Sequence, residues 1–386
     1  LIFLVQSDCN SMKKKVCVVT AARSEYGLLR WIIMELFKYD SFETIVIAAG
    51  THLSKKYGYT LTFIQDDNIK VSKCIDYLSD GDSLKDVSLS MSKCLNLFSD
   101  AFIELKPDLL VVLGDRYELL SICGAAILQN IPIAHIAGGE VTEGAIDDKI
   151  RNAVTMMSDI HFPNNSEAYS NIVRMIGTSK YVFNVGEPGI ENFVKMNLLD
   201  RKTLSKILGI CEEKDWLLVT LHPETKLSIE DNMTMVSNMI KALKCFSLSE
   251  IIITEANSDF GGGMINRYYD ETCSNCNFIH VYSSLGQLNF LSLMKEAKCV
   301  IGNSSSGIIE TPYLGVPTIN IGNRQKGRFM SNNIISVGYS YYEIYNAICS
   351  AMSKGRYEAD FTFGDGMTSK YIAQHIKDYL YDKKYD

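Results

Sequence analysis

The chain has 386 residues, of which 47% are hydrophobic and 22% are charged, a balance typical of globular proteins with a large core. Because this length exceeds that of one ordinary domain, we expect two domains of about 150–200 residues each. The formal net charge of −7 argues against a protein that binds nucleic acid over a broad basic surface, but it is compatible with one nucleotide in a local basic pocket.

The amino terminus, residues 1–11, is interpreted as an extension outside the fold. Its apolar residues 1–5 are too few for the core of a signal peptide, and no positively charged region precedes them. Met12, followed by three lysines, resembles a more natural start. Since no stretch of the sequence is long and apolar enough to span a membrane, we expect no membrane partner.

Short β-rich runs alternate with helical patterns from residue 16 onward. After the first run, large apolar side chains recur at three- and four-residue spacing between residues 28 and 37, which predicts a helix. Such alternation indicates βαβ units, and therefore an α/β domain whose parallel sheet is covered by helices on both faces. In this half of the chain we expect strands at 16–20, 45–49, 109–113 and 131–136.

Polar residues follow several of these strands. Arg23 is either a bidentate phosphate ligand or a surface ion-pair residue. Asp115, beside Arg116, would stay ionised as a general base, or the two residues form a structural pair that caps the next helix. Asp147 and Asp148 precede a further helix, where paired acids are either caps or catalytic groups. Because the carboxyl ends of parallel strands share one edge of a sheet, we expect these acidic clusters to converge on one cleft.

The same pattern restarts near residue 215 and predicts a second α/β domain. Two glycines and a proline within residues 185–189 indicate a hinge, which divides the chain into an N-terminal domain (12–187) and a C-terminal domain (188–367). A last helix, within residues 368–386, has no strand partner and is expected to pack across the domain junction. In the second domain we expect strands at 216–221, 251–254, 278–281, 299–301 and 318–321, and helices near 230–245 and 285–296.

A serine-rich run follows the strand at 299–301. The sequence GNSSSGIIE occupies residues 302–310 and predicts a small polar loop that leads into a helix. Ser304 and Ser305, together with the free N–H groups of a helix start, suit a phosphate group. Glu310, about one turn later, suits a ribose diol. A simple serine cap is the alternative, but the nearby run GNRQKGR, which contains Arg324, favours a bound nucleotide.

Two further residues of the second half belong to the same hypothesis. His222 follows the strand at 216–221, where it is either a phosphate contact or a structural histidine. Asn257 follows the next strand, and the glycines at 261–263 could shape the same pocket, although glycines alone are a weak signal.

Eleven cysteines are scattered along the sequence, and several lie in apolar runs, among them Cys17, Cys123 and Cys299. This distribution is typical of buried, reduced thiols and favours a cytoplasmic location. Cys273 and Cys276 have C-x-x-C spacing, but without a second pair or a histidine at ligand spacing they do not indicate zinc. We expect neither a metal nor another cofactor.

Six motifs occur in a fixed order, and together they resemble a known family. They are TAARSEYG at 20–27, GDR at 114–116, HIAGGE at 135–140, DDKIR at 147–151, HPET at 222–225 and the stretch 302–328. Over nearly all of residues 13–380 the chain is similar to the hydrolysing UDP-N-acetylglucosamine 2-epimerases of sialic-acid and polysialic-acid capsule biosynthesis.

The resemblance implies a GT-B-like fold, two Rossmann-like domains with the active site in the cleft between them, and a homodimer or homotetramer. It implies that UDP-GlcNAc and water give N-acetylmannosamine and UDP, by anti-elimination of UDP to a 2-acetamidoglucal and then hydration. Asp115 and Asp147 would be the acid/base residues. The contacts to UDP and substrate would come from Arg23, Gly27, Arg116, His222, Asn257, Ser304, Ser305, Glu310 and Arg324.

One position departs from the family. Several relatives carry a glutamate two residues after the histidine of the HIAGGE motif and use it in acid/base work, and others carry a histidine there. This chain has Ala137, which can do neither. One possibility is that Glu140, His135 or Asp148 takes over the acid/base role, and among these Glu140 is our catalytic candidate. The other possibility is that the substrate differs. A nearby branch of the family acts on UDP-N,N′-diacetylbacillosamine in legionaminic-acid synthesis.

Two other classes of protein share parts of this pattern. A GT-B glycosyltransferase would share the serine and glutamate nucleotide site but needs an acceptor. A catalytically silent nucleotide-sugar sensor would be expected to lack Asp115 or Asp147, and this chain keeps both.

Overall fold

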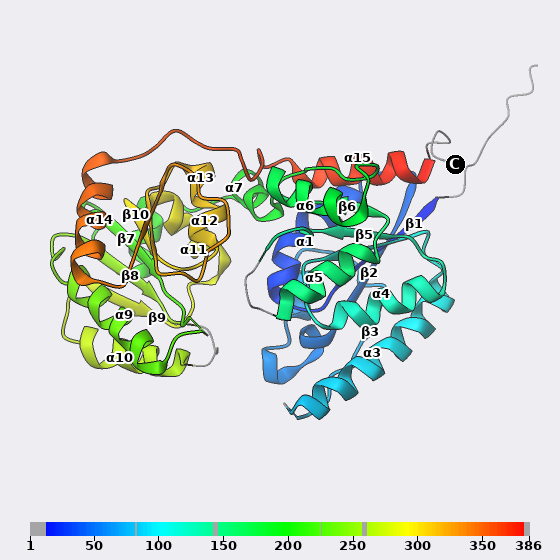
Figure 1. Ribbon diagram of the computed structural model, residues 1–386, viewed down its shortest axis with the longest axis horizontal. Coiled ribbons are helices and arrows are strands. Elements are labelled where there is room, and N and C mark those ends of the chain that lie inside the picture. The colour runs from blue at the N-terminus through cyan, green and yellow to red at the C-terminus, as the bar shows by residue number, and fades with distance from the viewer. Residues whose placement is uncertain (1–12, 82, 142–145, 225, 257–260, 382–386) are drawn as a thin grey trace, which may run out of the picture. The chain divides into compact units, whose positions relative to one another are not determined.

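The computed structural model describes residues 13–81, 83–141, 146–224, 226–256 and 261–381, and these form two compact α/β units (Figure 1). Of the described residues, those within 13–140, 146–189 and 367–381 belong to unit 1, and residue 141 and those within 190–366 belong to unit 2. The chain therefore enters unit 2 after Gly189 and returns to unit 1 at Met367. No helix in the described ranges is long and apolar enough to cross a membrane.

Unit 1 is built on six parallel strands in the order β3-β2-β1-β4-β5-β6. Its strands are β1 (Lys14–Thr20), β2 (Phe42–Ala49), β3 (Lys73–Ile75), β4 (Leu109–Leu113), β5 (Ile133–Ile136) and β6 (Ile160–Phe162). Its α-helices are α1 (Arg23–Leu36), α2 (Leu61–Asp66), α3 (Leu84–Leu105), α4 (Glu118–Leu128), α5 (Ile146–Met156), α6 (Ser166–Ile176) and α15 (Thr368–Tyr381), and its 3-10 helices are η1 (Gly50–Leu53), η2 (Lys55–Tyr57) and η3 (Pro188–Ile190).

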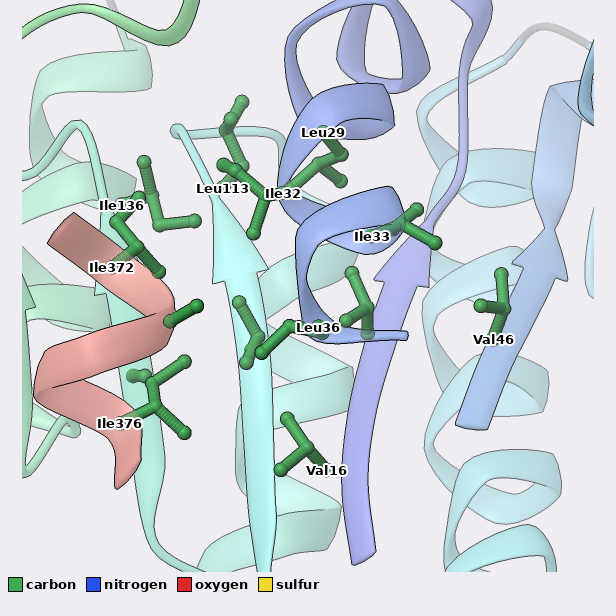
Figure 2. Packing of buried hydrophobic residues seen from close by; sticks show 14 of the residues in the cluster. Val16, Leu29, Ile32, Ile33, Leu36, Val46, Leu113, Ile136, Ile372 and Ile376 are labelled. Carbon is green, nitrogen blue, oxygen red and sulfur yellow. The ribbon is translucent and has the colours of Figure 1, made fainter. Parts of the chain in front are cut away.

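The strands of unit 1 are apolar on both faces, because helices cover the sheet on both sides. Val16 and Val18 of β1 pack with α1, α2 and α15 on one face. Cys17 and Val19, which point to the opposite side, pack with α3, α4 and α5. Figure 2 shows the first of these cores, where the isoleucine and leucine side chains of α1 and α15 gather against β1, β2, β4 and β5.

The carboxyl-terminal helix α15 completes unit 1. The sequence alone suggests that it packs across the domain junction. In the structure its buried residues Ile372, Ala373 and Ile376 lie in the core of unit 1, against α1. At its end, the Tyr381 hydroxyl donates a hydrogen bond to the Ser41 carbonyl (2.6 Å). An amphipathic helix docks where an apolar face is left open, and here that face is provided by α1 and the sheet.

Unit 2 repeats the plan of unit 1 with six parallel strands in the order β12-β11-β10-β7-β8-β9. Its strands are β7 (Trp216–Thr220), β8 (Glu250–Thr254), β9 (Ile279–Tyr282), β10 (Cys299–Gly302), β11 (Thr318–Ile321) and β12 (Ile334–Val337). Its helices are α7 (Glu191–Lys195), α8 (Arg201–Leu208), α9 (Ile229–Leu243), α10 (Gly262–Cys273), α11 (Gly286–Glu296), α12 (Ser306–Ile309), α13 (Thr311–Leu314) and α14 (Tyr341–Lys354).

The core of unit 2 is divided in the same way. Leu217 and Val219 of β7 face α9, α10 and α14. Trp216 and Leu218 face α8 and α11 on the other side of the sheet. Both units therefore have the Rossmann-like arrangement that the sequence predicted.

In each unit the strand order reverses at one point, between β1 and β4 in unit 1 and between β7 and β10 in unit 2. The crossovers leave the sheet in opposite directions there, and the loops beyond the carboxyl ends of these strands separate. The loop after β4 carries Asp115, the loop after β7 carries His222, and the loop after β10 carries Ser304. These two reversal points are therefore where a ligand is expected to bind.

Ile376→Ala is expected to destabilise the protein by about 2–5 kcal/mol, because it removes a fully buried side chain and leaves a cavity between α15 and the sheet. Urea denaturation followed by circular dichroism measures the change. Lys370→Ala, on the exposed side of the same helix, is the matched control and should shift stability by no more than about 0.5 kcal/mol. Equal effects of the two substitutions would contradict the packing of α15.

Candidate active site

A cluster of charged side chains lies beyond the carboxyl ends of β4 and β5 in unit 1. Gly114 ends β4 with a φ of +82°, and its N–H group donates to the Ile136 carbonyl (3.0 Å). A positive φ lets the chain turn at the strand end without steric cost. This turn brings Asp115 out of the sheet at the point where the strand order reverses.

Arg151 organises this cluster from α5. Its side chain is only 5% exposed, and it forms an ion pair with Asp115. It also donates to the Glu140 carbonyl oxygen (2.8 Å) and lies 3.5 Å from the Asp148 carboxylate. A buried guanidinium needs such oxygen partners to offset its desolvation. The loops after β4 and after β5 are thereby held to α5 around one cation.

Asp147, the second residue of α5, is the other proposed acid/base group. Partial burial raises the pKa of its carboxyl, the negative charge of Asp115 raises it further, and Arg151 opposes the shift. Asp115 is therefore close enough to Asp147 to affect the pKa of the Asp147 carboxyl. Two carboxyl groups in unequal environments can provide an acid and a base at the same pH.

The arginine beside Asp115 in the sequence has different partners from those that we predicted. Arg116 donates through Nε to the buried Glu118 (2.6 Å) and lies 3.8 Å from Glu25. The cation that pairs with Asp115 is Arg151 instead. Adjacent residues of an extended segment project to opposite sides, so adjacency in sequence does not predict a side-chain pair.

Glu25 is a charged residue of this region that the sequence analysis did not single out. Its carboxylate accepts hydrogen bonds from the N–H groups of Ala21 (2.7 Å) and Ala22 (3.1 Å), at the start of α1. Burial, reinforced by the charge of Glu118, raises the pKa of Glu25 to about 7. Its motif, a glutamate at the third position of a helix, is a recognisable capping signal.

His135 does not replace the acid that is absent at Ala137. It is fully buried on β5, and burial lowers its pKa to about 3. Its Nε2 lies 2.8 Å from the Gly114 carbonyl, which can only accept, so Nε2 carries the proton. Its Nδ1 then accepts from the Thr155 hydroxyl (3.2 Å). Both ring nitrogens of His135 are thus engaged in hydrogen bonds within unit 1. Ala137 itself has a backbone φ of +61°.

Glu140 keeps a half-buried carboxylate at this end of the sheet. Its Oε1 accepts a hydrogen bond from the side-chain amide of Asn164 (2.7 Å), which also donates to Glu187 (2.8 Å). Asn165 in turn donates to the Asn164 side-chain oxygen (3.0 Å) and caps α6. The Glu140 carboxylate is therefore held in place, and Glu140 stays the candidate for the missing acid/base group.

Two proposed substrate contacts lie on α1. Arg23 is the first residue of the helix and is exposed, with its guanidinium 5.9 Å from the centre of the Phe63 ring. Gly27 lies one turn further along and is half-buried. The structure places both at the carboxyl end of β1, the strand next to β4.

The second cluster lies beyond the carboxyl ends of β7 and β10 in unit 2. Gly302 ends β10 with a φ of +137°, and a Cβ atom on it would overlap the Thr220 carbonyl of β7. Only glycine fits this close approach. The next residue, Asn303, donates its backbone N–H to the same carbonyl (3.1 Å), and its side chain bonds to the backbone of His222.

Ser304, Ser305 and Glu310 follow in the order that the sequence predicted. The three side chains are half-buried, and Ser305 precedes the first residue of α12. Its hydroxyl does not form the cap hydrogen bond that the simpler interpretation required. Glu310 lies at the junction between the short helices α12 and α13.

Arg324 reaches the same region from the loop after β11. Its guanidinium donates to the Asn303 carbonyl (3.1 Å). The buried carboxylate of Glu224 holds this loop by accepting from the Asn323 N–H (2.8 Å) and from the Tyr339 hydroxyl (3.1 Å). His222 and Arg324 therefore lie at one end of the sheet. Asn257 lies outside the residues that the structure describes.

Among the described residues, no group of three or more His, Cys, Asp and Glu side chains is arranged to hold a metal ion. The arrangement offers carboxylates for proton transfer in unit 1, and serine, histidine and arginine groups for an anion in unit 2. Two Rossmann-like units of this kind form the GT-B-like α/β fold, to which solved nucleotide-sugar enzymes of similar structure belong.

The family is shown by comparison with known proteins. A family model described as UDP-N-acetylglucosamine 2-epimerase matches residues 34–377, and the chain belongs to this family. This confirms the resemblance that the sequence motifs indicated.

Individual relatives agree with this assignment. The chain is 40% identical over 324 residues to the GDP/UDP-N,N′-diacetylbacillosamine 2-epimerase (hydrolyzing) of Campylobacter jejuni, covering 84% of each protein. It is 32% identical to the polysialic acid biosynthesis protein P7 of Escherichia coli, covering 97% of this chain and 96% of that one. The solved UDP-GlcNAc 2-epimerase of Neisseria meningitidis bound to UDP-GlcNAc matches with a TM-score of 0.79 and 18% identity, over 94% of this chain and 100% of that chain.

His135 is expected to stay neutral, with its proton on Nε2, from pH 8 down to pH 5. Its pKa in the folded protein is about 3, whereas an unfolded chain takes up this proton near pH 6.5. The contribution of neutral, buried His135 to the free energy of unfolding is therefore fully present above about pH 6.5 and is lost progressively as the pH falls toward 3. NMR of the ¹⁵N-labelled imidazoles measures the protonation state, and titration of His135 near pH 6.5 would contradict its burial.

Proposed function

We propose that this chain is a hydrolysing 2-epimerase that converts UDP-GlcNAc and water to N-acetylmannosamine and UDP, for sialic-acid biosynthesis. The observation that carries the proposal is the pair Asp115 and Asp147, which Arg151 and mutual repulsion hold in unequal environments. Family membership and the hydrolysing relative from Campylobacter jejuni support the reaction type.

The carboxylates of unit 1 are assigned to the two proton transfers. In the first step, the proton on C2 passes to a carboxylate base, the bond between C1 and the UDP oxygen breaks, and a 2-acetamidoglucal forms. In the second step, water adds to C1 and C2 takes a proton on its opposite face. Removal of a weakly acidic C–H proton needs a positioned base. The pKa of Asp147 is raised by partial burial and by the charge of Asp115, which brings this carboxyl closer to the range of an acid/base group.

The cluster of unit 2 is assigned to UDP. Departure of a diphosphate requires fixed positive charge and hydrogen-bond donors, which Arg324, His222 and the serines Ser304 and Ser305 can supply without a metal. Glu310 is assigned to the ribose hydroxyls. By resemblance, Arg23, Gly27, Arg116 and Asn257 complete the contacts, and the enzyme is a cytoplasmic homodimer or homotetramer.

A second substrate is favoured by two specific observations. Ala137 stands where several relatives carry a glutamate and others a histidine, and the Campylobacter jejuni relative is named for GDP/UDP-N,N′-diacetylbacillosamine. That sugar lacks the 6-hydroxyl and carries a 4-acetamido group. We therefore propose it as the alternative substrate of the same reaction.

The proposed reaction is tested by an NMR time course in D₂O with each UDP-sugar and no acceptor. Release of UDP with deuterium at C2 of the free sugar is expected, because C2 is reprotonated from solvent. A manno-configured product identifies UDP-GlcNAc as substrate, and an altro-configured product identifies the diacetylbacillosamine sugar. Release of UDP only after an acceptor is added would instead indicate a glycosyltransferase, and absence of turnover at high enzyme concentration would indicate a nucleotide-sugar sensor.

Asp115→Asn and Asp147→Asn are each expected to lower kcat by about 10²–10⁴, because each removes a group that transfers a proton. UDP affinity should stay within about threefold of that of the wild-type protein, since neither aspartate is among the proposed UDP contacts. Coupled UDP-release kinetics and calorimetric titration with UDP measure the two quantities.

Glu310→Ala is the matched control for these variants and should weaken UDP binding, since it removes the proposed ribose contact. Wild-type turnover of Asp147→Asn would show that this residue only stabilises the start of α5.

A further inference from the structure

Asn303 has a side chain that joins the ends of two neighbouring strands. Its Oδ1 accepts from the His222 N–H (2.8 Å), and its Nδ2 donates to the His222 carbonyl (2.8 Å). An amide has a donor and an acceptor on separate atoms, so it can bond to both backbone groups of one residue at once. His222 follows β7, and Asn303 follows β10, so the pair spans the point where the strand order reverses.

The backbone of Asn303 holds a second segment. Its carbonyl oxygen accepts from the Arg324 guanidinium (3.1 Å) and from the side-chain amide of Gln325 (2.9 Å). The residue is 1% exposed, so these bonds form in a region from which water is largely excluded. In such surroundings a hydrogen bond is stronger, and an unpaired polar group is costlier, than at the surface.

We infer that Asn303 is a positioning residue of the nucleotide site, which fixes His222 through its side chain and Arg324 through its carbonyl. The inference rests on the proposed function, because His222 and Arg324 are the groups assigned there to the diphosphate. Asn303 itself does not need to touch the ligand. Its side-chain amide fixes the His222 backbone and its carbonyl binds the Arg324 guanidinium, and because both groups are neutral they leave the charge of Arg324 available to an anion.

Removal of the Asn303 amide is expected to affect UDP binding more than the rate of proton transfer. Without the amide, the His222 backbone loses two partners, and the Asn303 residue that anchors Arg324 is held to β7 only by the backbone hydrogen bond from its N–H to the Thr220 carbonyl. Removal of buried hydrogen bonds of this kind is expected to weaken UDP binding about tenfold to a hundredfold. The KM of the UDP-sugar should rise by a similar factor, whereas kcat should fall less than about threefold, because the groups assigned to proton transfer are untouched.

The test compares Asn303→Ala with Asn333→Ala by calorimetric titration with UDP, thermal melting and steady-state kinetics. Asn333 is a buried asparagine of the same unit, 3% exposed, whose amide donates to the Val316 carbonyl (2.7 Å) and to Thr311 (3.1 Å). It precedes β12, at the amino-terminal end of the sheet. Both variants should melt at lower temperature, but only Asn303→Ala should lose UDP affinity.

Asn303→Asp provides a second variant of unchanged size in case the alanine variant does not fold. It keeps the acceptor for the His222 N–H but turns a carboxylate oxygen toward the His222 carbonyl, so it should also weaken UDP binding. Wild-type affinity in the folded variants, or an equal loss in Asn333→Ala, overturns the positioning role while the proposed function stands. Failure of the wild-type protein to bind UDP overturns both.

Discussion

The reversal of strand order in each parallel sheet is the constraint on which both candidate sites depend. Between β1 and β4, and between β7 and β10, the crossovers lead away from each other and leave the strand ends uncovered. Gly114 and Gly302, both with positive φ, let the chain leave the sheet at these points.

The polar groups of the two candidate sites are held together by different kinds of residue, a charged one in unit 1 and a neutral one in unit 2. In unit 1 the buried cation of Arg151 gathers Asp115, Asp148 and the Glu140 carbonyl, so that negative charge is concentrated but balanced. In unit 2 the neutral residue Asn303 binds the His222 backbone through its side-chain amide and Arg324 through its carbonyl oxygen. An acidic residue in its place would repel a diphosphate and would compensate the positive charge that binds it. This difference fits proton transfer in one unit and anion binding in the other.

The sequence predicted the central strands and the strand-end motifs, but not the contacts among side chains. Buried runs such as 109–113 are apolar throughout, whereas the short edge strands β3, β6 and β12 carry little periodic signal and were missed. The motif residues follow strands, so their location could be inferred. The partner of Asp115 could not be inferred from the sequence, because Arg151 lies 36 residues away and reaches Asp115 only after α5 has packed against the sheet. The contacts of Asn303 could not be predicted for a similar reason, since its partners lie at the end of β7 and in the loop after β11, both distant from it in the sequence.

The position of α15 has a consequence for the order in which the chain can fold during synthesis. Ile372, Ala373 and Ile376 belong to the core of unit 1, yet they follow all of unit 2 in the sequence. A ribosome delivers residues from the amino terminus, so residues 190–366 are complete before the last helix of unit 1 exists. Unit 1 begins first and is finished last, and until then the apolar face of α1 and its sheet has no cover from α15.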